Sequence, residues 1–219
     1  MRKLFTVLAV AVVLLIAIML GAFLSIRPTA APLAAVNPGS NQEGGIIMQE
    51  RKGVVTMKGN PVTLVGPELK VGDKAPDFTS AANDLSSADL KSLCAGKVCV
   101  LSAVPSLDTP VCDRETRRFN EEAGKFGADV KVVTISMDLP FAQKRWCAAA
   151  GIENVQTVSD YKDASFGTAY GVLIKEFRLL SRTVFVLDKK GMIRYIQRVP
   201  EVTSEPDYNA VLEAVRKLK

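Results

Sequence analysis

Three short runs rich in valine and isoleucine constrain the fold most, because each has the length and the side chains of a buried strand. They lie at residues 97–104, 130–136 and 183–188. Apolar runs of this kind are typical of strands that are covered on both faces of a sheet. Segments of helical character at residues 110–126 and 140–150 lie between them and end near glycines. This alternation predicts an α/β domain with a central mixed β-sheet flanked by helices.

The domain is expected to begin with one hairpin and to close with another. Two short strands within residues 54–65 flank a turn in which Gly59 and Asn60 can take positive φ angles. This pattern predicts an N-terminal β-hairpin. A second hairpin at residues 188–199 is followed by a predicted helix at residues 206–218.

The N-terminal segment has the pattern of a membrane-spanning helix. Residues 4–26 form a run of 23 residues without a charge, preceded by Arg2 and Lys3 and followed by Arg27. A run of this length predicts a single transmembrane signal-anchor, and the flanking charges leave the N-terminus in the cytoplasm and the domain outside. The alternative is a cleaved signal peptide, which would also export the domain. The predicted division is a signal-anchor at residues 1–26, a flexible linker at 27–53 and a folded domain at 54–219.

Composition excludes several kinds of chemistry. The chain contains no histidine, which rules out Ser-His-Asp and Cys-His catalysis and histidine-ligated metals and haem. Any reaction must therefore use cysteine, carboxylate, lysine or arginine. The formal net charge is +5 and the isoelectric point about 9.0, but basic and acidic residues are interleaved. A nucleic-acid-binding protein would show a basic stripe with aromatic residues, so this function is not supported.

Cys112 stands at the predicted start of the helix over residues 110–126. If Thr109 is the N-cap, Pro110 occupies the first helical position and Cys112 the third. Unpaired backbone N–H groups and the positive end of the helix dipole stabilise a thiolate at this place. The placement predicts a reactive thiol. The alternative is a packed apolar residue, which is the commoner fate of a cysteine.

The four cysteines show no metal-binding or thioredoxin-like spacing. They stand at positions 94, 99, 112 and 147, and no C-x-x-C pair is present. This spacing argues against a four-thiolate zinc site and against a thioredoxin-type disulfide exchanger. Cys99 lies in a predicted strand and is interpreted as core packing, with Cys94 in the preceding loop. Outside the cytoplasm these two could bond to each other or to another chain.

The residues around Cys112 and Cys147 resemble those of one known family. Pro105, Thr109 and Cys112 match the P-x-x-x-T-x-x-C motif of peroxiredoxins. The wider text is similar to that of bacterial thiol peroxidases, the atypical two-cysteine peroxiredoxins. The matching segments are KGNPVTL at 58–64, PSLDTPVCDRETRRFN at 105–120, DLPFAQKRWC at 138–147 and SEPDY at 204–208. The resemblance covers about residues 54–219 and implies a thioredoxin-like (peroxiredoxin) fold.

The resemblance implies catalytic roles for residues around the first motif. Cys112 would attack the peroxide, while Thr109, Arg182 and the Cys112 N–H donate hydrogen bonds to the peroxide oxygens as charge develops. Pro105 would shield the sulfenic acid that results. The alternative for Thr109 is a plain N-cap, a role that it could hold together with the catalytic one, and the alternative for Arg182 is a surface ion pair.

Arg182 is also expected to offset negative charge near the thiolate. It stands in the segment LLSRTVFVLD, which matches the position of the family's active-site arginine. Asp113 and Glu115 flank Cys112 and are expected to oppose ionisation of its thiol. A guanidinium beside the sulfur would counter both carboxylates.

Cys147 is implied to be the resolving cysteine of the pair. It lies in a predicted helix with Asp138 as the expected N-cap and Pro140 in the first turn. Its attack on the Cys112 sulfenic acid would give an intramolecular disulfide and water. Because the two cysteines lie on different helices, local unwinding is expected on oxidation, with Trp146 as a fluorescent reporter. The alternative for Cys147 is an inert packed thiol.

The resemblance implies a thiol-dependent peroxidase that reduces hydrogen peroxide and organic hydroperoxides without metal, haem or flavin. Thioredoxin or a thioredoxin-like dithiol would reopen the disulfide, and the predicted export requires an extracytoplasmic donor. The domain is expected on the periplasmic side of a bacterial inner membrane, as a homodimer. The competing interpretation is a peroxide sensor or thiol redox relay that passes its oxidation to a client protein.

Overall fold

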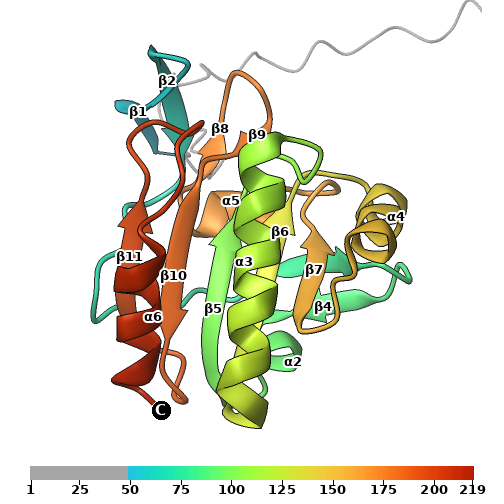
Figure 1. The fold of residues 1–219 in the computed structure, drawn as a ribbon. Helices are drawn as coiled ribbons and strands as arrows, with labels where there is room; N and C mark the ends of the chain where they lie inside the picture. The colour runs from blue at the N-terminus through green and yellow to red at the C-terminus, as the bar shows by residue number, and fades with distance from the viewer. Residues whose placement is uncertain (1–48) are drawn as a thin grey trace, which may run out of the picture. The chain divides into compact units, whose positions relative to one another are not determined.

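A computed structural model describes residues 49–219 of the chain (Figure 1). The predicted signal-anchor and most of the predicted linker lie outside these residues. Within residues 49–219, no helix combines the length and the apolar character that a membrane crossing requires.

The described residues form two sheets with helices packed on them. The strands are β1 (Glu50–Met57), β2 (Asn60–Val65), β3 (Thr79–Ala82), β4 (Ser87–Asp89), β5 (Val98–Ala103), β6 (Val130–Ser136), β7 (Val155–Ser159), β8 (Leu173–Ile174), β9 (Leu179–Leu180), β10 (Thr183–Leu187) and β11 (Ile193–Arg198). The helices are α2 (Leu90–Cys94), α3 (Pro110–Phe126), the 3₁₀ helix η1 (Gly127–Asp129), α4 (Pro140–Ala150), α5 (Ser165–Ala169) and α6 (Tyr208–Arg216).

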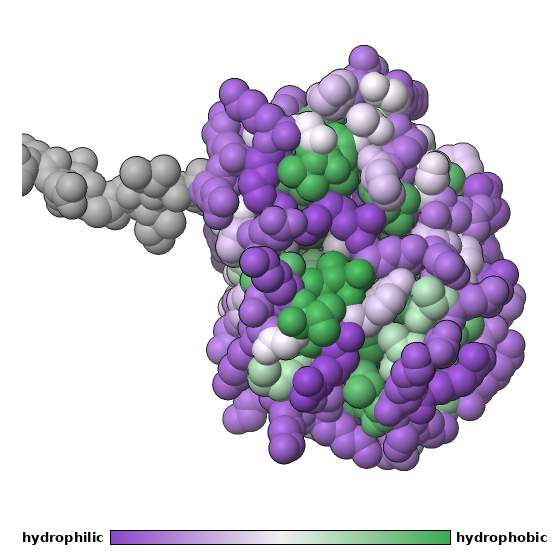
Figure 2. Space-filling model, turned by 90° about the vertical axis from the view of Figure 1, so that its left-hand side faces the viewer, coloured by the Kyte–Doolittle hydropathy of each residue, from purple (hydrophilic) through white to green (hydrophobic). Residues whose placement is uncertain are grey.

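The larger sheet is mixed, as predicted. Its seven strands follow the order β11-β10-β5-β6-β7-β3-β4, with β5, β6 and β7 parallel and the other neighbours antiparallel. The smaller sheet has the order β1-β2-β8-β9 and contains the N-terminal hairpin. The side of the molecule that carries β1, β2 and β11 is largely hydrophilic, with its hydrophobic residues in separate patches (Figure 2).

Strand β5 is buried on both faces, which explains why all of its residues except Ser102 are apolar. Val98 and Val100 belong to the core cluster that includes residues of α3 and α6, the two helices in front of the sheet in Figure 1. Cys99, Leu101 and Ala103 belong to the cluster on the other face, with residues of α2 and α5. Alternate side chains of β5 therefore enter the cores on opposite faces of the sheet, and the one polar side chain of the strand, Ser102, is itself buried.

The N-terminal hairpin differs from the prediction in its turn and in its extent. The residues with positive φ are Lys58 (52°) and Gly59 (78°), so the prediction for Asn60 was wrong. Asn60 instead opens β2 and pairs with Met57 across a two-residue turn. Strand β1 begins at Glu50, which pairs with Val65, so the last part of the predicted linker belongs to the sheet.

Cys94 and Cys99 form a disulfide, with their Cα atoms 5.5 Å apart. The interpretation of Cys99 as a simple packed thiol was therefore wrong. Cys94 ends α2, and the left-handed residues Ala95 and Gly96 (φ 50° and 69°) turn the chain so that Cys99 in β5 comes back beside it. Closing so short a loop restricts the unfolded chain and contributes about 2 kcal/mol to stability.

Candidate active site

The loop between β5 and α3 is fixed from the end of β6. Asp138 accepts hydrogen bonds from the Ser106 hydroxyl (2.7 Å) and the Leu107 N–H (2.8 Å). The prediction of Asp138 as a helix N-cap was wrong, because α4 starts one residue later with Leu139 in the N-cap position. The Asp138 carboxylate is engaged in holding this loop instead. Pro105 is buried in the same loop.

Thr109 is the N-cap of α3, as predicted, but its side chain does not cap the helix. The hydroxyl lies 2.8 Å from the Cys112 sulfur and 2.9 Å from the Ser106 carbonyl oxygen. A hydroxyl carries one hydrogen. Thr109 therefore donates to the sulfur when Cys112 is a thiolate, and to Ser106 when Cys112 keeps its proton. Thr109 therefore occupies the N-cap position with its backbone and places its hydroxyl at the Cys112 sulfur.

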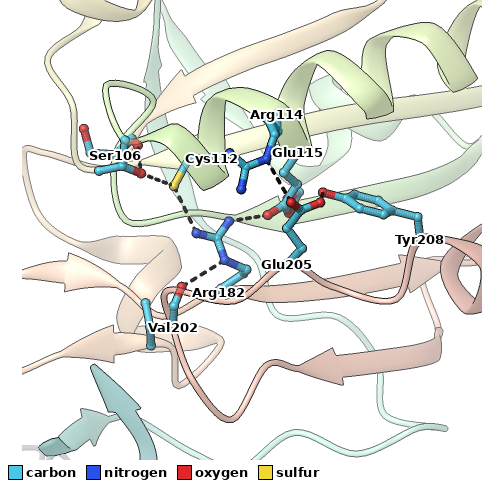
Figure 3. Close-up of polar contacts among 10 residues, drawn as sticks. Ser106, Cys112, Arg114, Glu115, Arg182, Val202, Glu205 and Tyr208 are labelled. Carbon is cyan, nitrogen blue, oxygen red and sulfur yellow. Dashed lines mark hydrogen bonds and ion pairs between the residues drawn. The ribbon is translucent and has the colours of Figure 1, made fainter. Parts of the chain in front are cut away.

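Arg182 lies inside the molecule, directly beside the sulfur (Figure 3). It is 1% exposed, so the alternative of a surface ion pair was wrong. Its Nη2 donates to the Cys112 sulfur at 3.3 Å, its Nε donates to the Val202 carbonyl at 3.0 Å, and its Nη1 pairs with the Glu115 carboxylate. All three guanidinium nitrogens thus have partners, which fixes the plane of the group.

Glu115 is a site residue that sequence reasoning misread. Its carboxylate is wholly buried, pairs with Arg182, and accepts a hydrogen bond from the Ser102 hydroxyl at 2.6 Å. The expectation that Glu115 opposes ionisation of Cys112 was incomplete, because its carboxylate also pairs with the arginine that lies beside the sulfur. A signal was present: Glu115 stands three residues after Cys112 and four before Phe119 on the buried face of α3. A charged residue on an apolar helix face requires a buried partner.

The charges of this cluster depend on one another. Burial works against the charge of Arg182, but Glu115 and the Cys112 sulfur outweigh it and raise the pKa of the guanidinium. Burial raises the pKa of the Glu115 carboxyl, and Arg182 and Ser102 oppose that rise. A cation held between a carboxylate and a sulfur is best balanced when both neighbours are ionised.

Helices α3 and α4 are joined near the two candidate cysteines. The Trp146 indole N–H donates to the Asp113 carboxylate at 3.1 Å, and Arg117 also binds that carboxylate. Arg117 additionally donates to the Ala150 carbonyl at 2.9 Å. The Trp146 side chain packs against the buried cluster that contains Cys112. The residues adjacent to the two cysteines are therefore in direct contact.

Cys147 is a free thiol with partners different from those of Cys112. Its sulfur lies 3.3 Å from the Thr157 hydroxyl on β7. Burial raises the pKa of the Cys147 thiol, although the Thr157 hydroxyl acts in the opposite direction. Cys147 also lines a cavity of about 540 Å³, whereas Cys112 is 0% exposed. Each sulfur must leave its present partners before the two can bond.

Comparisons with known proteins place the chain in a family. The redoxin family model matches residues 70–212. The thiol peroxidase of Bacillus subtilis (strain 168) is 58% identical over 167 residues, which cover 75% of this chain and 97% of that protein. The chain therefore belongs to the thiol peroxidases of the redoxin family. The thiol peroxidase of Oceanobacillus iheyensis is likewise 58% identical over 163 residues, covering 74% of this chain and 98% of that protein.

Solved structures confirm the predicted thioredoxin-like fold of this redoxin. A peroxiredoxin-like protein from Aquifex aeolicus superposes with a TM-score of 0.71 at 46% identity, covering 78% of this chain and 99% of that one. The thiol peroxidase from Chromobacterium violaceum shares the fold with a TM-score of 0.67 at 20% identity. The resemblance drawn from the P-x-x-x-T-x-x-C motif is thereby confirmed at the level of family and fold.

Proposed function

We propose that this redoxin reduces hydrogen peroxide and organic hydroperoxides with Cys112 as the nucleophile. The observation that carries the proposal is the sulfur at the N-terminus of α3, with the Thr109 hydroxyl at 2.8 Å and an Arg182 nitrogen at 3.3 Å. These two donors favour the thiolate that attacks. The thiolate takes the terminal oxygen of ROOH, the O–O bond breaks, and the leaving oxygen departs as ROH after gaining a proton. Pro105, buried in the adjoining loop, limits access of water to the sulfenic acid.

The second step is attack of Cys147 on the Cys112 sulfenic acid, which forms an intramolecular disulfide and releases water. The sulfur of Cys147 is hydrogen-bonded to Thr157 and that of Cys112 to Thr109 and Arg182. Closure therefore requires local unwinding at the start of α3 and along α4. Trp146 precedes Cys147 and contacts the Cys112 cluster, so this movement changes its surroundings.

The Cys147→Ser variant tests this sequence of steps. One equivalent of peroxide should oxidise Cys112 to a sulfenic acid, and the reaction should then stop, because serine cannot form the disulfide. Intact-mass analysis should show one added oxygen, whereas the unaltered protein should show the loss of two hydrogens. The Trp146 fluorescence change should occur in the unaltered protein alone. Sustained peroxide loss by the variant with a dithiol, at the unaltered rate, would contradict the role of Cys147.

The resolving step should accelerate as the pH rises. The attacking species is the Cys147 thiolate, and burial raises the pKa of this thiol above its ordinary value. Below that pKa the thiolate fraction grows roughly tenfold for each pH unit. Stopped-flow Trp146 fluorescence after mixing with excess peroxide measures the rate of disulfide formation. A rate that is flat from mildly acidic to alkaline pH would show that thiolate formation does not limit this step.

The proposed reductant is thioredoxin or a thioredoxin-like dithiol. Cys112 is fully buried, whereas Cys147 lines a cavity open to solvent. A protein thiol can therefore reach the sulfur of Cys147 more readily than that of Cys112. Its attack breaks the disulfide, restores the Cys112 thiolate, and a second thiol of the reductant then displaces Cys147.

The predicted anchor and location belong to the same proposal. The uncharged run at residues 4–26 supports a single transmembrane anchor with the redoxin domain on the periplasmic side of a bacterial inner membrane. The disulfide between Cys94 and Cys99 suits an oxidising compartment of this kind. Protease digestion of intact spheroplasts tests the topology, because the domain should be cleaved without lysis.

A homodimer is proposed on the basis of exposed apolar side chains beside the site. Leu139 and Phe141, at the start of α4, are 53% and 65% exposed. Large exposed apolar residues next to one another favour an interface. Sedimentation of the domain should give twice the monomer mass. The Phe141→Asp variant should sediment with a lower mass.

A further inference from the structure

The orientation of Arg182 depends on a loop distant from it in sequence. Its Nε donates to the main-chain carbonyl of Val202 at 3.0 Å, in the loop that follows β11. The guanidinium is a rigid plane, so a displacement of this carbonyl moves Nη2 relative to the Cys112 sulfur. Figure 3 shows the Arg182 guanidinium between Cys112 and the Val202 carbonyl, joined to each by a dashed line. The position of Val202 thereby influences the reactive thiol.

Val202 is held in place by the N-terminal hairpin. Its N–H donates to the Thr56 carbonyl at 2.8 Å, and the Thr56 N–H donates to the Pro200 carbonyl at 2.7 Å. The Val202 side chain is fully buried in a small apolar cluster that includes Val55 of β1 and Leu64 of β2. The loop is thus fastened to the hairpin on both sides of Glu201.

Glu201 makes most of the polar contacts of this junction. Its carboxylate accepts hydrogen bonds from the Thr56 hydroxyl (2.7 Å) and from the turn N–H groups of Lys58 (3.0 Å) and Gly59 (2.9 Å). It also accepts from the N–H and the hydroxyl of Thr203, at 3.0 and 2.5 Å. These donors, led by the Thr203 hydroxyl, hold the pKa of the Glu201 carboxyl well below its usual range. Five donors on two oxygens require a carboxylate, since a carboxamide can accept on one atom alone.

We infer that Glu201 is a positioning residue for the catalytic arginine. Its carboxylate fastens the loop after β11 to the turn at Lys58 and Gly59, and so fixes the Val202 carbonyl that orients Arg182 toward Cys112. The inference rests on the proposed function of Cys112 and Arg182. It assigns the N-terminal hairpin a part in catalysis, although neither strand contributes a side chain to the site.

Glu201→Gln in the Cys147→Ser background tests the inference. The oxidation of Cys112 by hydrogen peroxide is followed by rapid quenching and mass analysis of the trapped sulfenic acid. We expect the second-order rate constant to fall roughly tenfold, because a displaced guanidinium stabilises the thiolate and the leaving oxygen less well. The pH profile of Cys112 alkylation by iodoacetamide should also move to higher pH. A purely structural role of Glu201 would leave this profile unchanged.

Glu176→Gln is the matched control. Glu176 also uses its carboxylate to hold the hairpin, since both of its oxygens lie 3.0 Å from the Thr63 N–H of β2. No hydrogen bond joins it to the loop after β11. The oxidation rate and the alkylation profile of Glu176→Gln should match those of the parent, and equal losses in the two variants would overturn the inference.

The Arg182→Lys background tests whether the Glu201 substitution lowers the oxidation rate through the arginine or in some other way. In that background Glu201→Gln should cause no further loss of rate, and an additive loss would overturn the inference. If the Cys147→Ser protein itself does not react with peroxide, the proposed function is refuted. If the Cys147→Ser protein reacts, and Glu201→Gln changes neither its oxidation rate nor the pH profile of Cys112 alkylation, the positioning role alone is refuted. If Glu201→Gln does not fold, Thr203→Val takes its place, and the same comparison decides.

Discussion

Replacement of Cys112 by serine is expected to lower peroxide reduction by about a thousandfold or more. A serine hydroxyl is not ionised near neutral pH and is a far weaker nucleophile than a thiolate. The donors around the sulfur, Thr109 and Arg182, have no anion to stabilise in this variant. Loss of cumene hydroperoxide with excess dithiol, followed over many turnovers, measures the effect.

The control for this variant is the chain without its structural disulfide. Replacement of Cys94 and Cys99 by alanine removes a disulfide that lies outside the site, so it should lower stability and leave turnover intact. If Cys112→Ser reduced peroxide as fast as the unaltered protein, another group would have to be the nucleophile.

Replacement of Arg182 by methionine should lower both stability and activity. It leaves the Glu115 carboxylate buried without its cation, and breaking a buried pair in this way costs about 3–5 kcal/mol. It also removes a donor at the Cys112 sulfur, for which a loss of about a hundredfold in the oxidation rate is expected. Urea unfolding measures the first effect, and stopped-flow oxidation the second.

The paired variant Arg182→Met with Glu115→Leu separates these two effects. Both members of the ion pair become apolar, so the free energy of unfolding should recover most of its loss. The oxidation rate should stay low, because no guanidinium faces the sulfur. Recovery of both quantities would show that Arg182 serves the fold alone, and recovery of neither would show that its contact with Val202 matters more than the pair.

The sequence determined the parts of this protein that depend on neighbours along the chain. Helices α3 and α4 cover the predicted residues 110–126 and 140–150, although the N-cap of α4 is Leu139 and not Asp138. A proline fits the first turn of each helix, and a glycine follows each of them. Strands β5, β6 and β10 were visible as apolar runs because both faces of the sheet are covered. Short strands such as β3 and β4 were not predicted, since three or four residues carry too little periodicity.

The placement of Cys112, Thr109 and Pro105 in the site could be predicted from the sequence, because the three residues lie in one short segment. The other partners of Arg182 were not predicted, because Glu115 on α3 and Val202 after β11 lie in two segments that only the tertiary structure brings to the arginine. Glu115 was interpreted as an opposing charge, and Val202 was not considered at all. Asp138, which holds the loop before α3, was interpreted as a helix cap. A sequence shows which residues carry charge, but a buried ion pair or a main-chain contact is decided by which surfaces exclude water when the chain packs.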